Sequence, residues 1–219
     1  MIKLKDITKC YDTADVRFTA LNNVNLNIND GEHIAIIGES GAGKTTLLNI
    51  ISTLDKPTSG LAEYNGRNIG TLSEKDAAWL RLHEFGFVFQ DHMLMPMLNV
   101  WDNICMPLVL SGRKIDTPKI HKLAERILPD CRLEAMPHQL SGGQQQRVGI
   151  ARAVVTEPAV IFADEPTGNL DSVNSLNVMS VLLETSALNH STLIYVTHNE
   201  ELAQKADRII TIKDGNIIE

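Results

Sequence analysis

The sequence predicts an α/β fold with a mostly parallel central sheet, an N-terminal antiparallel β subdomain and a mostly helical subdomain inserted at about 91–155. Short apolar runs recur between stretches of helical periodicity, a pattern typical of buried parallel strands joined by helices. Residues 1–30 instead alternate apolar and polar side chains, as half-buried strands do. Between about 91 and 155 strand-like runs vanish. We interpret residues 1–219 as a single domain carrying this insertion.

The first elements follow from periodicity and turn residues. The alternating segment ends at an Asn-Asp-Gly sequence at 29–31, which predicts a turn. Residues 33–37 form an apolar run that predicts a buried central strand. Residues 45–54 carry apolar side chains at helical spacing and are followed by Lys-Pro-Thr-Ser-Gly, which predicts a helix and its end. Residues 85–89 predict another strand.

The insertion and the elements after it follow from the same signals. We expect the helical stretches of the insertion to be broken at Pro96, Pro107, Pro118, Pro129 and Pro137. After the insertion, the pattern predicts strands at 160–163 and 193–196 and a helix at 173–188. Two short runs around an Asp-Gly pair, 209–212 and 216–218, predict a closing hairpin.

Composition excludes several classes of protein. The chain has 20 Lys and Arg against 27 Asp and Glu, so its formal charge is −7, and we expect no nucleic-acid partner. Its three cysteines are far apart and match no metal-binding spacing, which indicates reduced thiols. The sequence has neither the apolar core of a signal peptide nor a run of about 18 apolar residues. We therefore expect a soluble, intracellular chain whose membrane role, if any, comes through a partner.

A phosphate-binding sequence joins the predicted strand at 33–37 to the helix that follows. It fits G-x-x-x-x-G-K-[ST] and consists of Gly38, Glu39, Ser40, Gly41, Ala42, Gly43, Lys44 and Thr45, with Thr46 next in the helix. Glycines let successive N–H groups point at phosphate oxygens, and the helix N-terminus adds a partial positive charge. Lys44 would contact the β- and γ-phosphates, and the Thr45 hydroxyl would bind Mg²⁺. The segment predicts a P-loop NTPase; the alternative is a glycine-rich turn before an ordinary helix.

Two acidic residues end the predicted strand at 160–163. Parallel strands deliver such residues to the sheet edge where a P-loop also opens. Asp164 would hold Mg²⁺ through water, and Glu165 would act as the general base that polarises the attacking water. The alternative is that both residues begin a surface turn before Pro166.

A second helix start shows an unusual composition. Ser141 and Gln144 match the S-x-x-Q capping box, and apolar residues at helical spacing follow. Gly142 and Gly143 nevertheless occupy the first turn, where each glycine costs about 0.5–1 kcal/mol relative to alanine. They are explained if a ligand approaches the backbone closely, as at an anion-binding helix N-terminus. Because the chain already has its own P-loop, this site is predicted to cap an ATP held by another copy.

With these motifs the chain resembles the ABC-type ATPases, whose signature reads LSGGQ, as residues 140–144 do. The resemblance covers essentially the whole chain. It implies that Gln90 contacts the nucleotide and Mg²⁺, that Asn169 and Asp171 line a dimer interface, and that His198 is a switch histidine. It also implies that Tyr11 stacks on adenine.

Each of these weaker elements has an ordinary alternative. Gln90 could be a surface residue at a strand end, and His198 a structural histidine. Phe18 lies near Tyr11 and competes for the stacking role. Asp171 could cap the helix that follows it.

Within the family the chain resembles the lipoprotein-release and macrolide-export branch. The resemblance implies a homodimer closed around two ATP and Mg²⁺, with catalysis by Lys44, Glu165 and His198. It also implies an integral membrane subunit that docks on the helical subdomain, and a cytoplasmic location, peripheral on the inner membrane. The segment 128–132 departs from the family pattern and puts partner choice in doubt.

Three other functions compete with this reading. A regulatory ATPase of the cell-division type would signal through a membrane partner without moving a substrate, and would have the same ATP chemistry. The acidic balance argues against an ABC-type ATPase that acts on DNA or ribosomes. A regulatory GTPase is disfavoured because the chain has no N-K-x-D segment.

The membrane partner is expected to dock on a methionine-rich segment. This segment follows Gln90 and contains Met93, Leu94, Met95, Met97, Leu98 and Val100. Methionine surfaces are adaptable and suit a groove for a partner helix. The alternative is that these side chains belong to an ordinary helical core.

Overall fold

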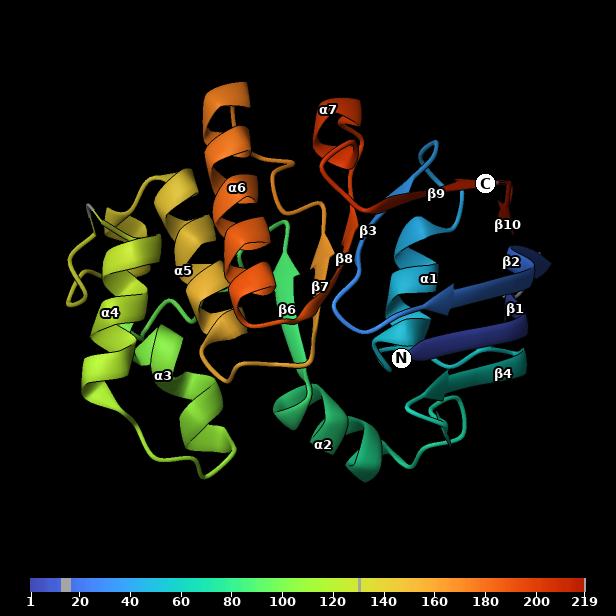
Figure 1. Ribbon diagram of the computed structural model, residues 1–219, viewed down its shortest axis with the longest axis horizontal. Helices are drawn as coiled ribbons and strands as arrows, with labels where there is room; N and C mark the ends of the chain where they lie inside the picture. The colour runs from blue at the N-terminus through green and yellow to red at the C-terminus, as the bar shows by residue number, and fades with distance from the viewer. Residues whose placement is uncertain (13–16, 130, 219) are drawn as a thin grey trace. The chain divides into compact units, whose positions relative to one another are not determined.

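The computed structural model describes residues 1–12, 17–129 and 131–218, so Asp130 of the departing segment lies outside the described residues. The chain divides into two compact units, labelled by element in Figure 1. Unit 1 comprises Met1–Arg81 and Ile194–Glu219, and unit 2 comprises Leu82–Leu193.

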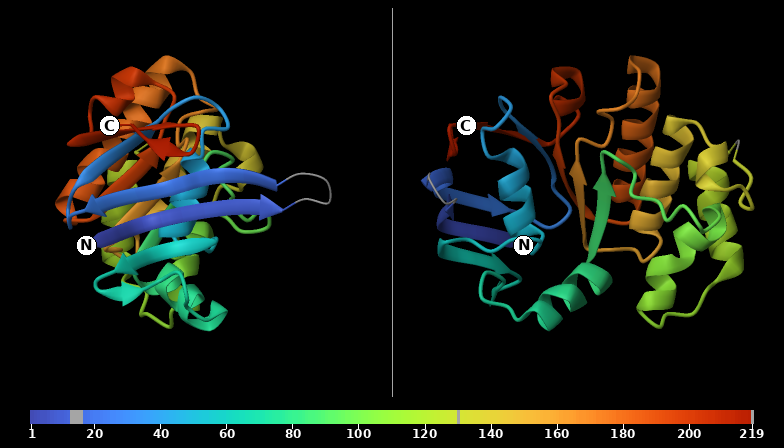
Figure 2. Two further views of the ribbon diagram at one scale, coloured as in Figure 1. Left: turned by 90° about the vertical axis from the view of Figure 1, so that its right-hand side faces the viewer. Right: turned by 180° about the vertical axis from the view of Figure 1, so that it is seen from behind.

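Unit 1 contains an antiparallel sheet in the order β2-β1-β4-β5, whose strands are β1 (Ile2–Asp12), β2 (Arg17–Ile28), β4 (Ser59–Tyr64) and β5 (Arg67–Asn68). Figure 2 shows β1 and β2 lying side by side. Leu4 pairs with Leu26, and both are buried, whereas Lys3 and Lys5 are exposed. The alternation of residues 1–30 therefore correctly predicted half-buried strands. β4 and β5 were not predicted from the sequence.

Unit 1 also contains part of a mostly parallel sheet. β3 (His33–Ile37) pairs in parallel with β9 (Arg208–Lys213), and β10 (Asn216–Ile217) pairs antiparallel with β9, as the hairpin prediction required. β8 (Thr192–Val196) carries the chain from unit 2 into unit 1. Besides α1 (Lys44–Ile51), the helices of unit 1 are α2 (Glu74–His83), at whose end unit 2 begins, and α7 (Glu200–Ala203). Neither α2 nor α7 was predicted from the sequence.

α1 (Lys44–Ile51) is shorter than its prediction of 45–54. The helix ends because Ser52 caps it and Thr53 takes a left-handed conformation with φ +63°. Leu54, expected on the buried face, is 47% exposed. The apolar spacing continued past the end of the helix, so this boundary was wrong.

Unit 2 pairs β6 (Phe85–Phe89) in parallel with β7 (Val160–Asp164) and is otherwise helical. Its helices are α3 (Val100–Leu110), α4 (Thr117–Ile127), η1 (Pro137–Gln139), α5 (Gly142–Val154) and α6 (Ser172–Leu188). Between 91 and 155 the described residues form no strand, and α5 buries the predicted apolar face. Figure 1 shows α5 and α6 alongside each other.

The prolines of this region do not all break helices. Pro107 lies inside α3, so its predicted break is wrong. Pro118 lies in the first turn of α4 and Pro137 begins η1, positions where a missing N–H costs no helical hydrogen bond.

Two further sequence expectations concern the thiols and the membrane. None of the three cysteines forms a disulfide, and burial, followed by the charge of Asp102, raises the pKa of Cys105 to about 11. Within the described residues no helix is long and apolar enough to cross a bilayer.

Candidate functional site

The predicted phosphate loop in unit 1 has the backbone that close phosphate contact requires. Gly38, Gly41 and Gly43 all have positive φ angles, of 147°, 79° and 108°. A Cβ atom at Gly38 would lie 2.1 Å from the carbonyl oxygen of Ile212, and one at Gly43 would lie 2.4 Å from that of Ala20. Internal packing therefore demands glycine at positions 38 and 43, while at Gly41 the space is open.

Lys44 is placed by the same loop. It is the first residue of α1 and is 5% exposed, and its Nζ donates to the carbonyls of Gly38 at 2.9 Å and Glu39 at 2.8 Å. An ammonium buried beside backbone carbonyls and an open helix N-terminus forms a cationic centre inside the loop. Thr45 and Thr46 are the next two residues of α1; Thr45 is exposed and Thr46 is half-buried.

Tyr11 lies at the end of β1 within a small polar network. Its hydroxyl donates to Asp55 Oδ2 at 2.8 Å, and it also interacts with the Thr46 side chain. Lys9 Nζ lies 2.6 Å from Asp55 Oδ1 and 4.8 Å from the Tyr11 ring centroid. Burial and the hydrogen bond with Asp55 raise the pKa of Tyr11, so its hydroxyl stays protonated at neutral pH. The network places an aromatic ring beside the helix that follows the phosphate loop.

His198 follows β8 and is exposed. The preceding Thr197 donates its N–H to the carbonyl of Ile36, two residues before Gly38. Within unit 1, therefore, His198 and the phosphate loop leave neighbouring strands at the same end.

In unit 2, register brings three predicted residues to one edge. Phe89 is paired with Asp164 in the parallel β6–β7 ladder, so Gln90 and Glu165 leave the sheet next to each other. Asp164 and Glu165 are half-buried, and Glu165 has a φ of +46°. Non-glycine residues with positive φ cost about 1–3 kcal/mol and concentrate at functional sites.

The predicted capping box at α5 is confirmed. Ser141 Oγ accepts from the Gln144 N–H at 3.3 Å, and Gln144 Oε1 accepts from the Ser141 N–H at 2.9 Å. Ser141 and Gly142 are exposed. A Cβ at Gly142 would come no closer than 3.6 Å to Leu170 Cδ2, and one at Gly143 no closer than 3.4 Å to Asn174 Oδ1. Packing within the chain therefore does not require either glycine.

The segment before α6 contacts both Gln90 and the start of α5. Gln90 Nε2 lies 3.4 Å from Asn169 Oδ1, and a Cβ at Gly168 would meet Gln90 Nε2 at 2.9 Å. Asp171 caps α6 by accepting from the Asn174 N–H at 3.0 Å. The alternative given for this residue from the sequence, that it caps the following helix, is therefore confirmed. Capping does not exclude an interface role, because Asp171 is exposed.

The methionine-rich segment is not part of a helical core. Residues 91–99 lie outside the helices, and Met93, Met95 and Met97 are 59%, 46% and 81% exposed. Leu94 and Leu98 are half-buried, and only Val100 is fully buried. The core alternative is therefore wrong for the methionines, and their docking role stays a prediction.

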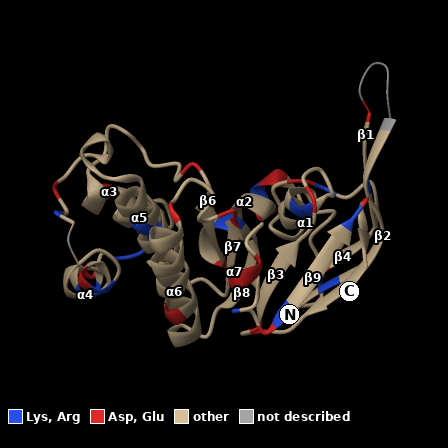
Figure 3. Ribbon diagram, turned by 90° about the horizontal axis from the view of Figure 1, so that it is seen from above, with Lys and Arg blue, Asp and Glu red and all other residues tan. Residues whose placement is uncertain are grey.

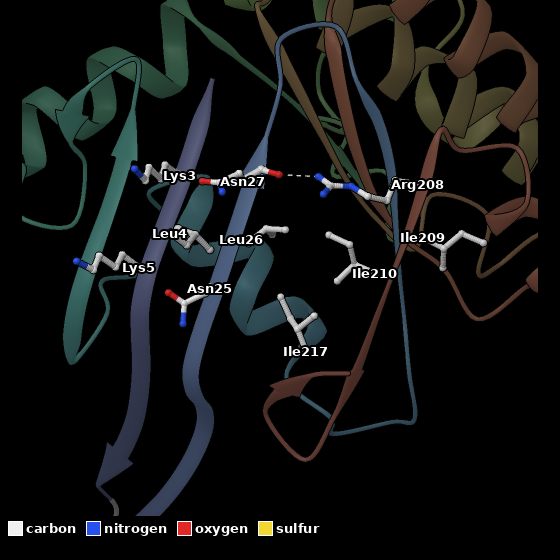
Figure 4. Close-up of a pocket in the computed structure, with 10 residues that line it drawn as sticks. All are labelled: Lys3, Leu4, Lys5, Asn25, Leu26, Asn27, Arg208, Ile209, Ile210 and Ile217. Carbon is white, nitrogen blue, oxygen red and sulfur yellow. Dashed lines mark hydrogen bonds between the residues drawn. The ribbon is translucent and has the colours of Figure 1, made fainter. Parts of the chain in front are cut away.

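Two cavities are lined by none of the predicted site residues. One of about 350 Å³ in unit 1 lies between Leu26 on β2 and Ile210 on β9, where Arg208 donates to the Asn27 carbonyl (Figure 4). Another, of about 560 Å³ in unit 2, lies beside α4, where Figure 3 shows acidic and basic positions close together. The predicted chemistry thus depends on loops at strand ends and a helix start rather than on these hollows.

Several residues near these sites escaped the sequence analysis. They are Lys9 and Asp55 beside Tyr11, Asn174 beside Gly143, and Gln146 and Arg152 on α5. The one available signal was a glutamine and an arginine among the apolar positions of α5. Their partners are too distant in the sequence to be found from spacing.

Comparison with known proteins gives a consistent result. The family profile described as "ABC transporter" matches residues 21–168. The chain is 45% identical over 223 residues to "Uncharacterized ABC transporter ATP-binding protein MJ1508" of Methanocaldococcus jannaschii, covering 100% of this chain and 98% of that protein.

Two longer relatives carry export names. The chain is 46% identical over 220 residues to "Probable syringafactin export ATP-binding/permease protein SyfD" of Pseudomonas syringae. It is 45% identical over 222 residues to "Macrolide export ATP-binding/permease protein MacB" of Pasteurella multocida. All of this chain is covered but only 34% of each relative, so the chain spans about a third of their length.

Among solved structures, one described as "Dimeric structure of a post-hydrolysis state of the ATP-binding cassette MJ0796 bound to ADP and Pi" matches with a TM-score of 0.90. The two chains are 39% identical, and the match covers 100% of this chain and 97% of that one.

Proposed function

Because this chain belongs to the ABC transporter family of ATP-binding domains, we propose that it binds and hydrolyses ATP as one of two identical copies and drives a membrane-embedded export subunit. The proposal rests above all on one observation. The start of α5 is capped and exposed, and it carries two glycines that packing within the chain does not require.

The phosphate loop supports the first part of this proposal. Its positive φ angles and the buried Lys44 ammonium fit a polyphosphate, because curled backbone N–H groups and a point charge are what such a group binds. Thr45, Asp164 and Gln90 would hold Mg²⁺, because their side chains carry the oxygen donors that this ion prefers. The ion would supply positive charge that offsets the charge of the phosphates. In this proposal Tyr11 stacks on the adenine ring of ATP, and residues 38–46 hold its phosphates.

Hydrolysis then requires a base and a positioned γ-phosphate. Glu165 is the proposed base that takes a proton from the attacking water, and Lys44 and His198 stabilise charge on the γ-phosphoryl group. The φ of +46° at Glu165 supports this role, since strain of this kind persists where a side chain must point in one direction.

The second copy completes the site. Ser141, Gly142 and Gly143 of one copy are proposed to meet the γ-phosphate held by the other, with Gln144 closing the capping box behind them. Asn169 and Asp171 would then lie at the seam. The relative described as a dimeric cassette bound to ADP and phosphate supports this arrangement.

The proposed membrane subunit docks on Met93, Met95 and Met97. Their exposure supports this role, because adaptable apolar side chains outside any helix suit a partner helix. Two relatives named as export ATP-binding/permease proteins continue beyond the part that matches this chain. The chain would accordingly work at the cytoplasmic face of the inner membrane.

The test is a variant that binds ATP without hydrolysing it. Glu165→Gln should lose the general base, slow turnover by about 10²–10⁴, and accumulate as an ATP-bound dimer. Size-exclusion chromatography with light scattering, with and without ATP and Mg²⁺, measures the dimer. The matched control is Glu184→Gln on the exposed side of α6, which should hydrolyse ATP normally. A Glu165→Gln protein that binds ATP yet remains monomeric would contradict the proposal.

A further inference from the structure

Two polar side chains of α5 hold the segment that follows β6. We call residues 89–93 the Gln90 segment. Gln146 is fully buried; its Nε2 donates to the Phe89 carbonyl at 3.2 Å, and its Oε1 accepts from His92 Nδ1. Arg152 is also buried, and it donates to the carbonyls of Met93 at 2.6 Å and His92 at 2.8 Å. Four hydrogen bonds thus join the Gln90 segment to α5.

The conformation of the Gln90 segment depends on being held. His92 and Met93 have φ angles of +60° and +48°, a region that non-glycine residues avoid. Such a conformation persists only where the surroundings enforce it. The four bonds act on these two residues and on Phe89, so they help to enforce it, together with the hydrogen bond from the His92 N–H to the Phe89 carbonyl within the segment.

The chemistry of Arg152 indicates more than packing. Burial lowers the pKa of its guanidinium, because removal from water disfavours the charged form. Among the described residues, its guanidinium donates to the backbone carbonyls of Met93 and His92. An apolar side chain of similar volume often stabilises a buried position at least as well. The distinctive contribution of Arg152 is therefore the grip on two successive carbonyls.

The Gln90 segment is also held from its other side. Asn169 Nδ2 lies 3.3 Å from both the Gln90 carbonyl and Asp91 Oδ1. A few residues later, Asp171 holds Asn174, whose side chain lies against Gly143 at the start of α5. The Gln90 side chain and the start of α5 are thus connected by two routes within unit 2.

We propose that Gln146 and Arg152 are positioning residues that lock the Gln90 segment to α5 and thereby couple the two ATP sites of the dimer. The inference rests on the proposed function. Gln90 serves the ATP of its own copy, whereas Ser141 at the start of α5 serves the ATP of the partner. A rigid connection between them makes the geometry at one ATP depend on the state of the other, which is a coupling free energy between sites.

The experiment removes the hydrogen bonds that Gln146 and Arg152 make to the Gln90 segment but replaces each side chain with an apolar one of similar size. Gln146→Met and Arg152→Leu are compared with the unmodified chain for kcat, KM and the cooperativity of hydrolysis with respect to ATP. Because a displacement of about 1 Å can cost about 10²-fold, kcat should fall roughly 10–100-fold, with cooperativity lost. ATP binding to the dilute, monomeric chain should not change, because the phosphate loop is untouched. Arg152→Lys should recover part of the activity.

Arg113 provides the matched control. Its guanidinium donates to two backbone carbonyls near the other end of α5, those of Thr156 at 2.7 Å and His83 at 3.3 Å, rather than to the Gln90 segment. Arg113→Leu should lower the melting temperature and keep cooperative hydrolysis.

Three outcomes would overturn the inference. The first is Arg152→Leu and Gln146→Met proteins that melt earlier but hydrolyse ATP cooperatively at the normal kcat. The second is an equal loss of cooperativity in Arg113→Leu. If Arg152→Leu does not fold, Gln146→Met decides alone by the same readout. A failure of the unmodified chain to hydrolyse ATP at all is the third, and it identifies the proposed function itself as wrong.

Discussion

Tyr11 shows at the scale of one residue how a side chain is held for a flat ligand. The hydroxyl is held by Asp55, and the Lys9 ammonium lies 4.8 Å from the ring centroid. Phe18, its cross-strand partner, is 55% exposed, and no hydrogen bond can hold its ring. A ring fixed on two sides loses less freedom when a base stacks on it. Tyr11 is therefore the better candidate for adenine stacking.

Replacing Tyr11 should weaken ATP binding. Tyr11→Ala is expected to raise the Kd for ATP about tenfold or more, because base–aromatic stacking contributes about 1–3 kcal/mol. Phe18→Ala is the control and should leave the Kd nearly unchanged. Isothermal titration with a non-hydrolysable ATP analogue measures both. A larger loss in Phe18→Ala would transfer the stacking role to Phe18.

At the scale of an element, α5 combines two tasks. Its capping box satisfies backbone groups at the helix start, and Gly142 and Gly143 keep that start thin enough for a ligand to reach the backbone. Its apolar face is buried, and Gln146 and Arg152 on it hold the Gln90 segment. One helix thus carries both the proposed partner-facing site and the connection to the chain's own site.

Two substitutions at Ser141 separate capping from catalysis. Ser141→Ala should lose the cap and about 1 kcal/mol of unfolding free energy. Ser141→Asp keeps a good capping residue but places a carboxylate where the partner's γ-phosphate is proposed to lie. It should retain stability and lose hydrolysis about 100-fold, the effect of removing one donor from a charged transition state. Urea unfolding and steady-state hydrolysis measure the two effects, and a fully active Ser141→Asp would contradict the proposed site.

At the scale of the whole molecule, the proposed chemistry is divided between copies. In the proposed dimer, the phosphate loop, the general base and the switch histidine of each site would come from one chain, and the capping helix start would come from the other. Donors supplied across an interface are worth about 10³–10⁵ in rate. A single chain should therefore bind ATP but hydrolyse it poorly.

Dilution tests this division directly. The rate of hydrolysis per chain should fall as the protein is diluted below the dissociation constant of the dimer. Steady-state rates over several decades of protein concentration measure it. A rate per chain that stays constant down to great dilution would contradict the shared site.

Mixing two defective variants provides the control. Lys44→Ala loses nucleotide binding but keeps a functional helix start, whereas Ser141→Asp keeps its phosphate loop but has a helix start that repels the partner's γ-phosphate. A mixed dimer contains one complete site, so the mixture should exceed the summed activities of the separate variants.

The residue sequence by itself determined the α/β class, the phosphate loop, the acidic strand end and the capping box at Ser141. The last three are local patterns of backbone and side-chain chemistry within eight residues or fewer, at 38–45, 160–165 and 141–144. The class follows from the order in which such local patterns of strand and helix alternate along the chain. Prediction failed where the local signals for an element were weak, or where the fold accommodated a residue that usually ends a helix. β4 and α2 were missed, Pro107 was accommodated inside α3, and α1 ended before Leu54.

Only the tertiary structure decided which distant residues act on one another. The β6–β7 register placed Gln90 beside Glu165, and packing of α5 brought Gln146 and Arg152 onto residues more than fifty positions earlier. It also showed that Gly38 and Gly43 are required by nearby backbone, whereas Gly142 and Gly143 are not. Spacing along a chain records local conformation, but contact between remote segments depends on how strands pair and helices pack.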